Sequence, residues 1–240
     1  MISMGALYIV STPIGNLEDI TVRAQKTLAS VDLILCEDTR RTGILLMEVS
    51  HPSMKKKDAI LRFDDHTENK KIPEIIQMLE AGENIALVSD AGTPLISDPG
   101  YRLVSECIKR GIGVISIPGP SAVLAALTSS GLPANRFLFL GYPPEKQSHR
   151  KKLFQSMLLC FETLEQRPTI VFYCAPHKIQ RTLEDMKDIF GDIEIVIARE
   201  LTKIHEEIWR GKLSEAQNTE FKGELVLLFS LGVPTISPPR

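Results

Sequence analysis

Short apolar runs rich in β-branched residues alternate along this chain with longer amphipathic stretches. In the first half, the short runs predict buried strands at Leu7–Val10, Asp32–Cys36, Ile85–Ser89 and Val114–Ile117. The stretches between them predict helices at Ile20–Ala29, Thr39–Glu48, Lys70–Ala81 and Tyr101–Arg110. Repeated strand–helix–strand units build a mostly parallel sheet covered by helices. The pattern therefore predicts an α/β fold.

The strongest turn signal inside the chain is Pro118-Gly119-Pro120, which directly follows a predicted strand. We place a domain boundary there, with one α/β domain at 1–118 and a second at 119–240. The predicted helices of the second domain are Ser121–Ser129, Lys151–Leu164 and Lys178–Phe190, and its strands are Arg136–Gly141, Thr169–Cys174, Glu194–Arg199 and Glu224–Phe229. An antiparallel strand within Thr202–Gly211 would make this sheet mixed. The proline-rich tail Pro234–Arg240 is expected to be frayed.

Composition limits the class of protein and its location. Of the 240 residues, 43% are hydrophobic and 24% are charged, which is typical of a globular protein. No apolar run approaches the ~18–20 residues needed to cross a bilayer, and the N-terminus does not resemble a signal peptide. We expect a soluble cytoplasmic protein without membrane contact. The four cysteines have no metal-ligand spacing, so no metal site is predicted; all but Cys174 lie in apolar or helical patterns.

The charge of the chain offers no general attraction to nucleic acid, because the net charge is −2. Local basic clusters are Arg40-Arg41, Lys55-Lys56-Lys57 and the stretch from Lys146 to Lys152. Each cluster alone is compatible with an ordinary solvated surface. Together they leave a nucleic-acid partner possible but do not establish one.

Three loops that follow predicted strands carry the polar and glycine-rich residues: Ser11–Asp19, Asp90–Gly100 and Pro118–Ala122. Ligands of open α/β sheets bind at the carboxyl ends of the strands, where such loops gather. None of the loops has the GxGxxG pattern of a dinucleotide site. Asp98 is predicted to cap the following helix, with Pro99 at its first position. Asp90 has no such duty and could accept hydrogen bonds from a ribose hydroxyl or an ammonium group.

These loops resemble those of the tetrapyrrole-methylase superfamily, and in particular its ribosomal RNA small subunit methyltransferase I family. The matching motifs are YIVSTPIGNLEDIT, CEDTRRTG, SDAGTPLISDPGY, PGPSA, SGLP and ARELTK, six in the family's order between Leu7 and Glu224. Many superfamily members have a G-P-G-D loop after the first strand, whereas this chain has Thr12-Pro13 there, as the family does.

The resemblance implies two α/β domains with S-adenosyl-L-methionine in the cleft between them, and 2′-O-methylation of a cytidine in the decoding region of 16S ribosomal RNA. It also implies a homodimer that acts on this RNA or on the small ribosomal subunit. By position, the cofactor residues would be Pro13, Ile14, Asp90, Gly92, Thr93, Ile96, Ser121, Ala122, Tyr173 and Leu201. The RNA-binding residues would be Arg40, Arg41, Lys151 and Lys152.

The chain departs from the family pattern after one second-domain strand. The stretch Cys174-Ala175-Pro176-His177-Lys178 stands where the family usually has Glu-Ser-Pro-His-Arg. The stretch Asp64 to Glu68 also varies a His-Asp-His-Asn-Glu pattern, and many relatives continue beyond the last strand.

A base that removes the proton of the ribose hydroxyl would accelerate methyl transfer by ~10²–10⁴-fold. The candidates on motif loops are His66, Glu200 and Lys203, followed by Glu37 and Asp38. Two other functions remain open. One is methylation of a tetrapyrrole, for which a G-P-G-D first loop would be the sign. The other is a non-catalytic RNA-binding ribosome-assembly factor, which cofactor affinity would exclude.

Overall fold

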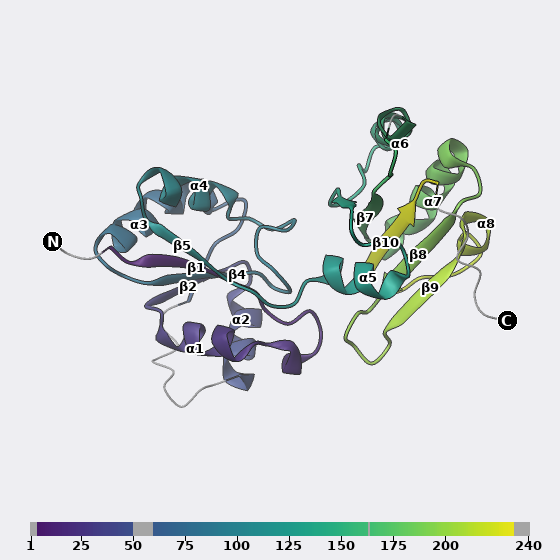
Figure 1. The fold of residues 1–240 in the computed structure, drawn as a ribbon. Coiled ribbons are helices and arrows are strands. Elements are labelled where there is room, and N and C mark those ends of the chain that lie inside the picture. Colours follow the sequence, from purple (N-terminus) through teal and green to yellow (C-terminus); the bar gives the residue numbers. More distant parts are fainter. Residues whose placement is uncertain (1–3, 50–59, 163, 233–240) are drawn as a thin grey trace. The chain divides into compact units, whose positions relative to one another are not determined.

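The computed structural model describes residues 4–49, 60–162 and 164–232, and it contains two compact α/β units (Figure 1). The first unit ends at Ser121 and the second begins at Ala122. Both have a five-stranded sheet, so the predicted fold class is confirmed. The predicted Lys55-Lys56-Lys57 cluster and the proline-rich tail lie outside the described residues.

The sheet of the first unit is parallel throughout and has the strand order β3-β2-β4-β1-β5. Its strands are β1 Ala6–Val10, β2 Leu33–Cys36, β3 Ile60–Arg62, β4 Ile85–Val88 and β5 Gly113–Ile117. At the carboxyl edge, Val10 of β1 lies opposite Val88 on one side and Ile117 on the other. The short edge strand β3 was not predicted, because three residues are too few to show a periodic pattern.

The helices of the first unit cover both faces of its sheet (Figure 1). Helices α1 (Val22–Ser30) and α2 (Thr39–Glu48) lie on one face, and α3 (Glu68–Glu80) and α4 (Tyr101–Lys109) lie on the other. A short 3₁₀ helix, η1, spans Leu17–Asp19. The chain leaves β2 toward one edge of the sheet and leaves β4 toward the other. Ligands bind where neighbouring connections diverge in this way, so the topology directs attention to the carboxyl ends of β2 and β4.

The second unit has a mixed sheet with the order β6-β7-β10-β8-β9, as predicted. Its strands are β6 Phe137–Phe139, β7 Thr169–Cys174, β8 Glu194–Arg199, β9 Glu207–Lys212 and β10 Leu225–Ser230. Only β6 and β7 pair in parallel; the other neighbours are antiparallel. The strand expected within Thr202–Gly211 is β9, which begins later because a turn occupies the first residues.

The helices of the second unit are α5 Ala122–Ser130, α6 Gln147–Glu162, α7 Pro176–Phe190 and α8 Leu213–Ala216. Aromatic rings join α6 and α7 to the sheet, and the Phe190 and Phe229 ring centroids are 5.4 Å apart. Between the two helices, the Arg150 guanidinium contacts the Asp185 carboxylate at 2.5 and 2.8 Å. Both side chains are almost fully buried. Carbonyl oxygens of Pro144 and Glu145 accept further hydrogen bonds from Arg150, which offsets the cost of desolvating the pair.

Candidate active site

The loops after β1, β4 and β5 meet at the carboxyl edge of the first sheet. Thr12 and Gly92 exchange two backbone hydrogen bonds, with N···O distances of 2.9 and 3.1 Å. The Thr93 hydroxyl donates to the Pro120 carbonyl at 3.0 Å and therefore accepts from the Ser11 hydroxyl, also at 3.0 Å. Three motifs that are far apart in sequence thus form one hydrogen-bonded junction.

Two glycines permit this close approach of the loops. Gly92 has a φ of +87°, and a Cβ added to it would lie 3.2 Å from a methyl carbon of Ile14. A Cβ on Gly119 would lie 2.9 Å from the Ser11 Cβ, closer than packed carbon atoms come. Larger residues at these positions would separate the loops, so the close packing of the loops requires glycine at both positions.

The loop from Asp90 to Gly100 is strained and differs from the sequence prediction. Leu95 and Ser97 have φ values of 72° and 69°, a conformation that costs a side-chain-bearing residue about 1–2 kcal/mol. Asp98 is not the helix cap, so that prediction was wrong: α4 begins at Tyr101, and Gly100 occupies the N-cap position with a φ of 124°. Burial instead raises the pKa of the Asp98 carboxyl to about 6, opposed by a hydrogen bond with Ser89.

A pocket of about 300 Å³ opens beside this junction within the first unit. Its apolar wall comes from the first loop and from α2, and includes Ile14, Leu17, Ile44 and Leu45. Asp90 lines the pocket and also holds the loop after β2: one carboxylate oxygen accepts from the Asp38 amide at 3.1 Å, and the other lies 3.4 Å from Arg41. The sequence did not reveal this second role, because the partner residues are about fifty positions away.

The carboxyl of Glu37, directly after β2, has the pKa most suited to proton transfer. Burial raises this pKa to about 7, and the negative charges of Asp98 and Asp90 raise it further, followed by those of Asp65 and Asp64. The next residue behaves in the opposite way, since hydrogen bonds from Arg40 hold the pKa of Asp38 well below its usual range. Two adjacent carboxyls therefore differ in protonation near neutral pH, as acid–base sites commonly require.

Comparison with known proteins decides the family. The Tetrapyrrole (Corrin/Porphyrin) Methylases model matches residues 6–217. A protein from Thermotoga maritima called ribosomal RNA small subunit methyltransferase I is 48% identical over 89% of this chain and 90% of its own length. Its Synechocystis counterpart is 45% identical over 98% of this chain and 82% of its own length. The chain belongs to the ribosomal RNA small subunit methyltransferase I family. A solved diphthine synthase shares the fold, with a TM-score of 0.70 at 13% identity over 93% of this chain and 89% of that one.

The residues of the first unit fit S-adenosylmethionine, the cofactor of this family. Adenosine and methionine carry no phosphate, so a site for them needs apolar walls, near backbone groups and one or two polar anchors. Ile14 and Leu17 supply an apolar wall, Gly92 brings backbone close, and Asp90 supplies a carboxylate. Of the predicted cofactor residues, Pro13, Ile14 and Asp90 line the pocket, and Gly92 and Thr93 form the adjoining junction. Ile96 is exposed in the strained loop, and Ser121 directly precedes α5.

In the second unit, two predicted cofactor residues of the family lie at strand ends. Tyr173 is next to last in β7, and its ring packs against Phe139 at 4.9 Å and Tyr142 at 5.6 Å between centroids. Leu201 is buried just after β8, between Glu200 and Thr202, whose φ values are 48° and 65°. Ala122 is the first residue of α5.

The three residues first considered as catalytic have other surroundings. His66 is exposed in the first unit, and its backbone amide donates to Asp64 at 3.1 Å. In the second unit, Glu200 accepts from the Glu224 amide at 2.8 Å and from Lys203 at 3.0 Å. These two bonds, in that order, lower the pKa of Glu200, so its carboxylate is a weaker base than that of Glu37.

The predicted RNA-binding residues differ in how freely they can reach a phosphate. Arg40 is 87% exposed, although Asp38 holds it with two hydrogen bonds. Lys152 is exposed on α6, whereas its neighbour Lys151 pairs with Asp188 at 2.7 Å and with Asp185 at 3.6 Å. Arg41 contacts Asp90 in the pocket of the first unit, so it serves that site as well.

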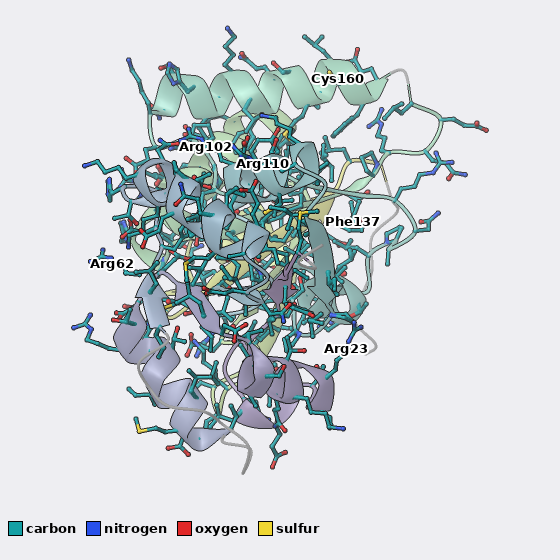
Figure 2. The ribbon with its side chains drawn as sticks, turned by 90° about the vertical axis from the view of Figure 1, so that its left-hand side faces the viewer. Arg23, Arg62, Arg102, Arg110, Phe137 and Cys160 are labelled. Atoms are coloured by element: carbon teal, nitrogen blue, oxygen red, sulfur yellow. The ribbon has the colours of Figure 1, made fainter. Side chains whose placement is uncertain are left out.

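The structure places Cys174 among the buried cysteines, although its sequence context differs from that of the other three. Cys174, singled out in sequence, is buried, and burial raises the pKa of its thiol to about 11. The exposed cysteine is Cys160, near one end of α6 (Figure 2). Among the described residues there is no group of three histidine, cysteine or acidic side chains placed to hold a metal ion. Within the same ranges, no helix is long and apolar enough to span a membrane.

Proposed function

We propose that this chain methylates the ribose 2′-hydroxyl of a cytidine in the decoding region of 16S ribosomal RNA, with S-adenosylmethionine as the methyl donor. The observation that carries the proposal is the identity of 45–48% with ribosomal RNA small subunit methyltransferases I over most of each chain. The junction of three family motifs beside a pocket that fits the donor supports it.

In the proposed site, the first unit holds the donor through Asp90, Pro13, Ile14, Gly92 and Thr93, with Ile96 in the adjoining loop. Ser121, Ala122, Tyr173 and Leu201 complete the set of donor-binding residues. When bound, S-adenosylmethionine supplies an activated methyl group on a sulfonium. The role of the protein is to hold the 2′-oxygen in line with that group, because alignment provides much of the rate in such a displacement.

The proposed base is the Glu37 carboxylate, in place of His66, Lys203 or Glu200. An oxygen of this carboxylate takes the proton of the 2′-hydroxyl as the oxygen–methyl bond forms and the sulfur–methyl bond breaks. Two observations support this role: Glu37 lies at the carboxyl end of β2 next to the β4 loop, and its pKa of about 7 matches a base that works near neutral pH.

The proposed substrate is 16S ribosomal RNA, alone or in the small ribosomal subunit, and the proposed compartment is therefore the cytoplasm. Arg40, Arg41, Lys151 and Lys152 remain the proposed RNA contacts of the basic motifs. A homodimer is also proposed. Each basic cluster is small and the net charge is −2, so a single chain attracts RNA weakly, and pairing two chains would combine several clusters in one surface.

The experiment is methylation of purified small ribosomal subunits by the purified protein with isotope-labelled S-adenosylmethionine. Nuclease digestion and mass spectrometry of the 16S RNA should then place one labelled methyl group on the ribose of a decoding-region cytidine. Subunits from cells that lack the gene serve as substrate, since their site is unmodified. A label on a base, or transfer to a tetrapyrrole instead, would refute the proposal. Absence of any S-adenosylmethionine binding would favour the non-catalytic assembly factor.

A further inference from the structure

The second unit contains a cavity of about 410 Å³ that has no part in the proposed donor site. It lies at the carboxyl ends of the parallel strands β6 and β7, between the chain that leads into α6 and the start of α7. Its lining includes Tyr142, Pro144, Cys174, Lys178 and Arg181. The departure from the family pattern at Cys174 to Lys178 thus falls on this cavity.

The lining of the cavity contains three cationic side chains, Arg150, Lys178 and Arg181. Lys178 and Arg181 are three residues apart on α7, so they project from the same face of the helix. Lys178 pairs with Glu145, and the buried Arg150 is neutralised by Asp185. Arg181 is exposed, makes only a 3.5 Å hydrogen bond to a carbonyl, and forms no ion pair with any described residue. The carboxylate of Glu145 acts on Arg181 only through space, after its stronger contact with Lys178, so the exposed guanidinium can still bind an anion.

The cavity lining also contains one aromatic ring, that of Tyr142. Tyr142 lines the cavity and is nevertheless 60% exposed. Its ring lies 5.6 Å from that of Tyr173, a proposed cofactor residue, with 56° between the planes. Tyr142 thus belongs both to the cavity lining and to the aromatic cluster at the end of β7.

We infer that this cavity binds one nucleotide of the substrate RNA other than the methylated cytidine, with its base on Tyr142 and its phosphate on Arg181. The inference rests on the proposed function, since it assumes an RNA substrate. Unpaired RNA bases are commonly bound by stacking on aromatic rings, while Arg or Lys contacts the phosphate. An exposed ring and an exposed guanidinium in the same lining supply both contacts within a single unit.

The test uses two variants of the full-length protein, Tyr142→Ala and Arg181→Gln, and a synthetic RNA hairpin of the 16S decoding region. Loss of the stacked base should weaken RNA binding roughly fivefold or more. Loss of the phosphate contact should reduce the log–log salt slope of binding by about 0.7. In methylation assays with small subunits, KM for RNA should rise while the dissociation constant for S-adenosylmethionine stays unchanged.

Matched controls separate stacking and charge from folding. Tyr142→Phe keeps the ring and should bind RNA like the wild type. Arg136→Gln removes another exposed arginine, just before the amino end of β6, at the opposite edge of the sheet from the cavity. Wild-type RNA affinity in Tyr142→Ala and Arg181→Gln would overturn the inference, as would an equal loss of S-adenosylmethionine affinity. Failure of the wild-type protein to methylate 16S RNA would overturn the proposed function instead.

Discussion

Replacing Glu37 with Gln should make the protein more stable above neutral pH and nearly inactive. The carboxyl has a pKa of about 7 in the folded protein against an ordinary 4.5, mainly because it is buried and then because Asp98 and Asp90 are close. Between these two values the unfolded chain has released its proton while the folded protein still holds it. Stability therefore falls as pH rises through this window, and the full cost is present above pH 7.

The size of this effect follows from the difference in pKa. Each pH unit corresponds to about 1.4 kcal/mol, so the ceiling is about 3 kcal/mol. Glu37 is only half-buried and interacts with Asp98, whose own pKa is raised to about 6, so we expect about 1–2 kcal/mol. For a protein of this size that is roughly 2–8 °C in Tm. Glu37→Gln should show this gain at pH 8 and lose most of it at pH 5.

Activity should change in the opposite direction. If the Glu37 carboxylate is the base, kcat in the variant should fall by ~10²–10⁴-fold, and S-adenosylmethionine affinity should be kept. The wild-type kcat/KM should rise with pH up to about 7 and then level off. Circular-dichroism melts at several pH values and methylation kinetics measure both effects, with Glu74→Gln, an exposed glutamate of α3, as the control. A variant that retains wild-type kcat, or that is less stable at pH 8, would refute the reasoning.

Four further outcomes are expected. Asp90→Ala should weaken S-adenosylmethionine binding by ~1.5–3 kcal/mol, and an unchanged dissociation constant in calorimetry would remove Asp90 from the site. Arg40→Ala should lower the salt slope of RNA binding by up to about 1 without affecting the donor, and an unaltered slope would make this arginine a local partner of Asp38 only. Arg150→Ala should lower the free energy of unfolding by ~3 kcal/mol in denaturant melts, because the buried Asp185 would keep only Lys151, at 3.6 Å, as a cationic partner; a loss below 1 kcal/mol would contradict this. Light scattering should give about twice the 26.7 kDa chain mass, and a monomer that still methylates RNA would exclude the dimer.

At Asp98 and at Lys151, contacts with residues distant in sequence change what the local sequence pattern suggests. Asp98 followed by Pro99 has the pattern of a helix start, yet α4 begins beyond Gly100. The loop is held elsewhere by the junction with Thr12, and the Asp98 side chain turns toward Ser89. In the sequence, Lys151 and Lys152 are equivalent members of one basic cluster. The packing of α6 against α7 then places Asp188 beside Lys151, which the local sequence could not show.

The periodicity of apolar residues determined by itself the α/β class, the parallel and mixed sheets and most strand positions, because alternation and helical spacing are local properties. The motif loops likewise revealed the family and the residues at the strand ends. Only the tertiary structure decided which side chains meet. The pKa of Glu37 depends on carboxylates from two other loops, and the cavity at Tyr142 and Arg181 joins residues almost forty positions apart. Burial and electrostatic interaction act through space, so no local pattern in the sequence could report them.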